Sequence, residues 1–386
     1  MNAVAHEYGT DREPGKGTII PGTHLSLDSI FSGLSGSTQG SEATRLPVRI
    51  ISQFGAPRWV LPADARRAIP VLQSWRPYSV KSRMRWGAIV SACRLRALNV
   101  LPGVICDDLS CDLSYWGKQL QGYSHSWAMA AYIGNPSPTR KVLLFFIDET
   151  AQVRAVVKVS LCPAAKAAIL NEVQVLKRIR GRLSLPQVLF SDSAEGIAGQ
   201  SWVEGRNVPR AFGREHLELL MRLACERPCA RLTERREQLE TRIASLSSLV
   251  DSSLVHRALS LLDIEVETME CVEHGDFTPW NMRRMRDGQL ALIDWEWSVE
   301  AGYPWQDVCR YFYLQAYLFR DATNLWNRVM RHPLLAEYRR HLDLSTEAAR
   351  GLTAYFLLRF LCGSHEEGDL GKVAFATAKI QELLSK

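Results

Sequence analysis

Two short stretches decide how this chain folds: residues 273–281 read EHGDFTPWN, and residues 293–297 read IDWEW. Between them lies the dipeptide Asp287-Gly288, with apolar residues on either side. Asp-Gly between apolar runs is typical of a two-residue β-hairpin turn. The sequence therefore predicts that the two stretches are joined by a tight hairpin.

The predicted hairpin brings two polar side chains together. With Asp287 and Gly288 as the turn, the residue numbers of two facing residues add up to 575. Asn281 therefore faces Asp294. Directly paired residues have Cβ atoms about 5 Å apart. An amide oxygen and a carboxylate are hard oxygen donors, which suit Mg²⁺. Asp276, five residues before Asn281, adds a second carboxylate that could act as a base. Alternatively, each residue could cap its own backbone in a turn; their joint occurrence favours the functional interpretation.

In these residues the chain resembles the aminoglycoside phosphotransferase and choline kinase-like family, which has a protein-kinase-like fold. His274, Gly275 and Asp276 stand where that family carries its catalytic loop, and Asn281 and Asp294 match its two Mg²⁺ ligands. The resemblance extends over roughly residues 122–386 and specifies the family far better than the substrate. Protein kinases themselves are disfavoured, because no long activation segment ending in Ala-Pro-Glu follows.

The resemblance implies an α+β, bilobal fold, with a small antiparallel β lobe, a larger helical lobe and, here, an N-terminal extension. We expect a disordered arm over residues 1–44, because it is rich in Gly, Ser and Thr. A basic, partly helical extension follows over 45–121. The β lobe, with one helix, would occupy 122–208, and the helical lobe 209–386.

The family also implies a strand lysine that holds the nucleotide phosphates and a helix glutamate that tethers it. Lys158 lies inside the apolar run AVVKV, where a lysine is costly unless it is paired. Glu172 lies in the following helix, on the same face as Ile169 and Leu176. A buried cation and a buried anion that can neutralise each other indicate the nucleotide clamp. The alternative is a lysine at a strand edge and a glutamate at the margin of the apolar stripe.

Two further nucleotide contacts follow from the resemblance. Residues 200–206 resemble the hinge between the lobes, so backbone groups of Ser201 and Val203 would bind the adenine edge. The loop 134–139 joins two predicted strands where the family covers the phosphates, and Ser137 could touch phosphate there. An ordinary hairpin loop explains that composition equally well.

Supporting roles are expected for several residues near the motif. Asp307 resembles the acid that braces the catalytic loop, His274 is expected to be architectural, and Glu296 could face the substrate or the metal's waters. The nearby aromatic residues could form a wall for a sugar or a cage for an amine, but a helical-lobe core is the favoured interpretation. The C-terminal acids Glu366, Glu367 and Asp369 could attract a cationic acceptor or form a solvated loop, which is favoured.

The charge of the chain is unevenly distributed. The net charge is +6, yet residues 45–96 carry eleven Lys or Arg and one acid, about +10, which leaves about −4 for the rest. The whole protein is therefore not a basic nucleic-acid binder. Residues 80–99 predict a basic amphipathic helix that could lie on an anionic membrane surface; alternatively it docks on the next domain with its charges solvated.

Two features of the sequence bear on the cellular compartment of the protein. Nine cysteines at irregular spacings lack zinc-site patterns and make a secreted disulfide framework unlikely, so structural thiols in a reducing cytoplasm are expected. No apolar run approaches the ~18 residues that a membrane span needs, and the first residues do not resemble a secretion signal.

Together these features predict an ATP- and Mg²⁺-dependent kinase that moves the γ-phosphate to a hydroxyl of a small molecule, such as an aminoglycoside, sugar or amino alcohol. Asp276 would accept the hydroxyl proton. The alternative is a catalytically inactive, nucleotide-binding scaffold that acts through its basic N-terminal segment at a membrane or nucleic acid. The presence of every expected catalytic residue disfavours it.

Overall fold

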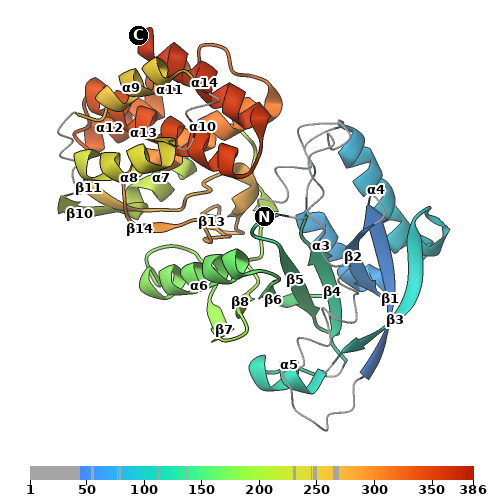
Figure 1. Ribbon diagram of the computed structural model, residues 1–386. Helices are drawn as coiled ribbons and strands as arrows, with labels where there is room; N and C mark the ends of the chain where they lie inside the picture. The colour runs from blue at the N-terminus through green and yellow to red at the C-terminus, as the bar shows by residue number, and fades with distance from the viewer. Residues whose placement is uncertain are drawn as a thin grey trace. The chain divides into compact units, whose positions relative to one another are not determined.

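The structure, a computed structural model, describes residues 44–386 apart from 54–55, 76, 78–79, 112, 125, 136, 229–231, 245, 247–249 and 264–268. The chain divides into two compact units: residues up to 177 with 186–204, and residues 178–185 with 205–386. In Figure 1 the first unit runs from blue to green and the second from yellow to red. The arm predicted for residues 1–44 lies outside the described residues, except Thr44.

One antiparallel sheet of eight strands forms the framework of the first unit, with the order β3-β1-β2-β4-β5-β6-β8-β7. Its strands are β1 (Thr44–Gln53), β2 (Ala56–Pro62), β3 (Val104–Cys111), β4 (Ala128–Ile133), β5 (Lys141–Ile147), β6 (Val153–Ser160), β7 (Val188–Asp192) and β8 (Ile197–Ser201). Strand β2 pairs with β4 through Trp59 and Tyr132. The basic segment, in which the sequence analysis predicts only helix, therefore adds three strands to the sheet.

Both faces of this sheet are covered. Met129 and Ala131 of β4 point into one apolar core, which includes Trp116 of α5 (Leu113–Gln119). Ala130 and Tyr132 point into the other, against η1 (Ala65–Ala68), α3 (Ile69–Ser74), α4 (Val80–Arg94) and η2 (Leu98–Val100). A strand buried on both faces needs apolar residues at every position, which explains the continuous apolar run of β5.

Helix α4 corresponds to the basic helix predicted over residues 80–99. Its residues Ile89, Val90 and Cys93 are buried in the second core, whereas Arg83 and Arg85 are exposed. The structure favours the docked alternative, because the buried side of α4 packs within the unit. Met84 and Leu95 of the same stretch remain exposed. Among the helices in the described part of the chain, none is both long and apolar enough to cross a membrane.

Helix α6 (Pro163–Arg178) follows β6 and begins with a proline, which fits a first helical turn. Its Ile169 and Val173 pack against Ala198 of β8 and Val188 of β7. This packing fixes the face of α6 that carries Glu172, which is fully buried.

The second unit is mainly helical and centres on α13 (Thr346–Glu366), which packs against four other helices (Figure 1). The helices are α7 (Arg214–Leu223), α8 (Leu232–Ala244), α9 (Ser252–Ser260), α10 (Gln306–Phe319), α11 (Leu325–Met330), α12 (Pro333–His341), α13 and α14 (Leu370–Leu384). Two small sheets accompany them. One contains β10 (Ala224–Pro228), β11 (Met269–Glu273) and β14 (Val299–Gly302), and the other β13 (Leu290–Leu292), β12 (Met282–Arg284) and β9 (Arg206–Asn207).

The expected fold class, an antiparallel β lobe followed by a helical lobe, is confirmed. The sequence pattern also predicts helices near 214–226, 232–249, 253–264, 306–320, 345–362 and 369–385, and α7, α8, α9, α10, α13 and α14 lie at these places with ends shifted by a few residues. Helices α11 and α12 are not among these predictions. The pattern predicts a strand over 199–203, and β8 lies two residues earlier.

Candidate active site

The predicted catalytic loop follows β11 in the helical unit. Gly275 has φ +76°, and a Cβ on it would lie 2.0 Å from the carbonyl oxygen of Trp297. Only glycine fits such a position, because a side chain would be strained in conformation and would also collide with backbone. The close approach holds the loop against the segment that carries Asp294 and Glu296.

His274 fixes the loop from inside. It is fully buried; its Nδ1 accepts the amide hydrogen of Asp276 at 3.2 Å, and its Nε2 lies 3.1 Å from the carbonyl oxygen of Ile293. An Nδ1 that accepts leaves the proton on Nε2, so the neutral ring donates to Ile293. With both nitrogens engaged in backbone contacts, His274 is architectural, as the sequence analysis expects.

Asp307, from the first turn of α10, braces the same loop. Its two carboxylate oxygens accept the amide hydrogens of His274 at 2.7 Å and Gly275 at 3.0 Å. Complete burial, together with the nearby Glu273 carboxylate, raises the pKa of Asp307 to about 7, although the two backbone hydrogen bonds oppose the rise. The bracing role implied by the resemblance corresponds to these contacts.

Asp276 is held by two side chains. Its Oδ1 accepts from Arg310 Nε at 3.1 Å, and its Oδ2 accepts from Asn281 Nδ2 at 2.7 Å. The carboxylate is only 2% exposed, so a charged hydrogen-bond partner offsets the cost of burying it. Sequence reasoning missed Arg310. The available signal was its place three residues after Asp307 on the same helix, which puts both side chains on one face.

The hairpin register differs by one residue from the prediction. Met282 pairs with Leu292, and the Ile293 amide donates to the Asn281 carbonyl at 2.9 Å, so Asn281 lies opposite Ile293. The loop contains three residues, and Gly288 takes the left-handed position at φ +85°. The prediction that Asn281 directly faces Asp294 is therefore wrong, because the Asp-Gly dipeptide ends a three-residue loop instead of forming a two-residue turn.

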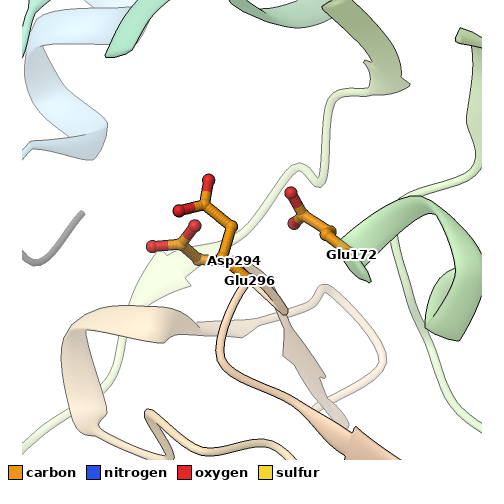
Figure 2. Close-up of side chains that lie close together, drawn as sticks. All are labelled: Glu172, Asp294 and Glu296. Carbon is orange, nitrogen blue, oxygen red and sulfur yellow. The ribbon is translucent and has the colours of Figure 1, made fainter. Parts of the chain in front are cut away.

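Asp294 departs from regular strand geometry. Its φ of +67° lies in the left-handed region, which is rare for a residue with a side chain and is often found at functional sites. One carboxylate oxygen of Asp294 and one of Glu296 lie within 4.8 Å of each other, and both residues are buried. Figure 2 shows the two carboxylates projecting side by side from the segment after β13.

The donor set suits a hard divalent cation. Asn281 Nδ2 donates to Asp276, whereas its Oδ1 is buried without a hydrogen-bond partner among the described residues. A buried acceptor without a partner carries a desolvation cost that a bound ion or water would remove. With the carboxylates of Asp294 and Glu296 on the neighbouring segment, the residues present fit Mg²⁺, which prefers oxygen ligands.

The predicted nucleotide residues belong to the first unit. Lys158 Nζ on β6 lies 2.7 Å from Glu172 Oε2 on α6, and both side chains are buried. Figure 2 shows the Glu172 carboxylate at its place on α6. The predicted pairing is present. Its role in holding phosphate stays a prediction.

The other predicted contacts lie in loops or at strand ends. Ser201 ends β8, and its amide donates to the Gln187 carbonyl at 2.8 Å; Val203 lies just after the strand, outside any helix or strand. Ser137 is exposed in the loop between β4 and β5. Adenine and phosphate binding by these residues stay predictions.

The aromatic residues near the loop mostly form core. Five of the six are buried, namely Phe277, Trp280, Trp295, Tyr303 and Trp305, whereas Trp297 is 40% exposed. The favoured core interpretation therefore holds for all but Trp297. Of the C-terminal acids, Glu366 pairs with Arg242, and Glu367 and Asp369 pair with Lys372. These pairs disfavour a site for a cationic acceptor. The expected loop is short, because Glu366 ends α13 and Asp369 caps α14.

Comparisons with known proteins find one matching family model and several similar solved structures. The model of a family described as the phosphotransferase enzyme family matches residues 143–344. No curated protein matches the chain. Similar solved structures include APH(2″)-IIia in complex with GDP and kanamycin, with 16% identity, coverage of 71% of this chain and 99% of that one, and a TM-score of 0.48. The macrolide 2′-phosphotransferase MphH from Brachybacterium faecium has 14% identity, coverage of 65% and 91%, and a TM-score of 0.45.

Proposed function

The chain belongs to the phosphotransferase enzyme family, and from this premise we propose that it transfers the γ-phosphate of ATP to a hydroxyl group of a small molecule, with Mg²⁺ as cofactor. The acceptor would be of the aminoglycoside, sugar or amino alcohol type. The observation that carries the proposal is the buried Asn281 Oδ1, which has no hydrogen-bond partner among the described residues. The other side-chain atom of this amide, Nδ2, donates to Asp276, and Asp294 lies one residue beyond the position opposite Asn281 in the hairpin.

Each residue has a role that follows from its chemistry. Asp276 orients the acceptor hydroxyl and takes its proton, because its carboxylate is fixed by Arg310 and Asn281. Asn281 and Asp294 hold Mg²⁺, with Glu296 positioned to bind its waters. The ion, when bound, neutralises charge on the phosphates.

The first unit supplies the nucleotide contacts in this proposal. Lys158, tethered by Glu172, neutralises charge on the α- and β-phosphates. Backbone groups of Ser201 and Val203 bind the adenine edge, and Ser137 contacts phosphate. Phosphoryl transfer needs positioning and charge neutralisation more than covalent help, so a small set of fixed groups suffices.

The test is an ATP-consumption assay against a panel of aminoglycosides, macrolides, sugars and amino alcohols. We expect Mg²⁺-dependent turnover with at least one acceptor, and a loss of about a hundredfold or more in kcat for Asp276→Asn, the size typical of a lost general base. Asp287→Asn makes the same chemical change at an exposed hairpin position and should leave the rate unchanged. Equal rates for wild type and Asp276→Asn would overturn the proposed role of Asp276.

A further inference from the structure

A cavity of about 210 Å³ in the helical unit is lined by charged residues that the proposed reaction does not use. It lies among α8, α13 and β14. Three arginines line it, Arg235 and Arg242 from α8 and Arg359 from α13, with Glu273 as the acid in the lining. Among the residues that the structure describes around this cavity, cations therefore exceed anions by two.

The single acid in the lining cannot neutralise all three cations. Glu273 Oε1 accepts the amide hydrogen of Tyr303 at 2.9 Å, and its Oε2 accepts from Arg359 at 3.1 Å. Both of its oxygens are thus engaged, one of them with backbone. Glu273 therefore offsets the charge of one of the three arginines.

The two α8 arginines differ in their partners. Arg235 donates to the backbone carbonyl of Ala301 at 3.3 Å. Arg242 is paired with Glu366, whose two carboxylate oxygens accept from Arg242 Nε and Nη2. With Glu366 counted, three arginines face two acids among the residues that the structure describes here.

The cavity also has a defined wall. The Arg359 guanidinium lies 5.3 Å from the centre of the Tyr355 ring, and Tyr355 is buried. Stacking on an aromatic ring orients the planar guanidinium and leaves its edge for hydrogen bonds. Arginines recognise phosphate and carboxylate groups through pairs of parallel N–H donors.

We infer that this cavity, called the α8–α13 pocket, binds a phosphate group, either free or carried by a larger small molecule. The inference goes beyond phosphoryl transfer, because it requires neither ATP nor Mg²⁺. The phosphate would lie against Arg235, Arg242 and Arg359, whose combined charge Glu273 and Glu366 only partly offset.

Calorimetric titration of the full chain in EDTA, with no nucleotide present, tests the inference. The probes are inorganic phosphate, glucose 6-phosphate and glucose. We expect saturable binding of at least one phosphate-bearing probe and none of glucose. Because charge-assisted hydrogen bonds are worth about 1.5–3 kcal/mol, Arg235→Gln and Arg242→Gln should each raise the Kd about tenfold or more. Arg257→Gln, on exposed α9, should leave it unchanged.

The two probes distinguish the source of the anion. Tighter binding of glucose 6-phosphate than of inorganic phosphate assigns the pocket to a phosphate carried by a larger molecule, whereas equal binding assigns it to the free ion. Phosphate binding that both α8 variants leave unchanged, or no binding at all, would overturn the inference. Neither result bears on the ATP-consumption assay, so this proposal and the proposed function can fail separately.

Discussion

At the scale of single residues, the helical unit contains a histidine held in its neutral form. His216 Nδ1 accepts the Gly213 amide hydrogen at 3.0 Å, and its Nε2 lies 3.4 Å from the Tyr311 hydroxyl, which itself donates to the Arg210 carbonyl. A proton on Nδ1 would remove the first of these hydrogen bonds. Burial, reinforced by Arg284 and opposed by Glu215, lowers the pKa of His216 to about 4.

This histidine makes the protein sensitive to acid. Above pH 6.5 it is neutral in both states. Below that pH, His216 becomes protonated in the unfolded chain but stays neutral in the folded protein until about pH 4. The free energy of unfolding therefore falls by up to about 3 kcal/mol as the pH decreases through this window. We expect wild type to lose about that much more than His216→Gln between pH 7 and pH 4, measured by urea unfolding. Equal losses would contradict the account.

Residue identities in the site were largely readable from the sequence. Asp276, Asn281 and Asp294 stand out because their spacing matches a motif, and Lys158 because a cation interrupts an apolar strand. Glu273 gave no such signal, and Arg310 gave only its place three residues after Asp307. Their partners, Arg359 and Asp276, lie 86 and 34 positions away in sequence, so no local pattern identifies these contacts.

At the scale of elements, the hairpin shows where prediction stops. The Asp-Gly signal located the turn, but two- and three-residue loops both place glycine in the left-handed region, so the dipeptide does not fix the register. A one-residue shift changes which side chains face each other. Here the positive φ of Asp294 ends the regular strand alternation just beyond the paired residues.

Two glycines with similar backbones test how tightly the loop and hairpin are constrained. Gly288 has φ +85° and open space around it, whereas a Cβ at Gly275 would meet the Trp297 backbone. We expect Gly288→Ala to lower the free energy of unfolding by about 1 kcal/mol, because only the left-handed backbone conformation is unfavourable for alanine there. Gly275→Ala should cost several times more and abolish turnover. Denaturant unfolding of both variants checks this, and similar costs would refute the close-packed loop.

At the scale of the whole molecule, the basic segment is part of a folded unit. Strands β1, β2 and β3 were not foreseen, because arginines interrupt the apolar pattern of β1 and β2 and two aspartates interrupt that of β3. Pro47 in β1 also argues against a strand. Arg58 of β2 is nevertheless buried, since it donates to the Ile133 carbonyl at 2.9 Å. Such long-range contacts decide the fold of this segment.

Removing that segment should therefore disrupt the first unit. A chain that starts at residue 122 lacks three strands and exposes the edge of β4 and both cores. We expect it to aggregate, whereas a chain that starts at residue 44 keeps every described strand and should remain folded. Soluble yield and circular dichroism distinguish the two, and a well-folded chain from residue 122 would show that the segment is dispensable.

The central claim is that Asn281 and Asp294 hold the Mg²⁺ of a bound nucleotide. The most direct test is calorimetric titration of wild type and of Asp294→Asn with a non-hydrolysable ATP analogue. Each protein is titrated once in the presence of Mg²⁺ and once in EDTA. The account predicts that wild type binds the analogue about tenfold or more tightly with Mg²⁺ than without, and that the variant loses this difference, since a charged ligand is worth at least 1.4 kcal/mol. Binding that is equally tight in EDTA, or Mg²⁺ dependence that persists in Asp294→Asn, would contradict it.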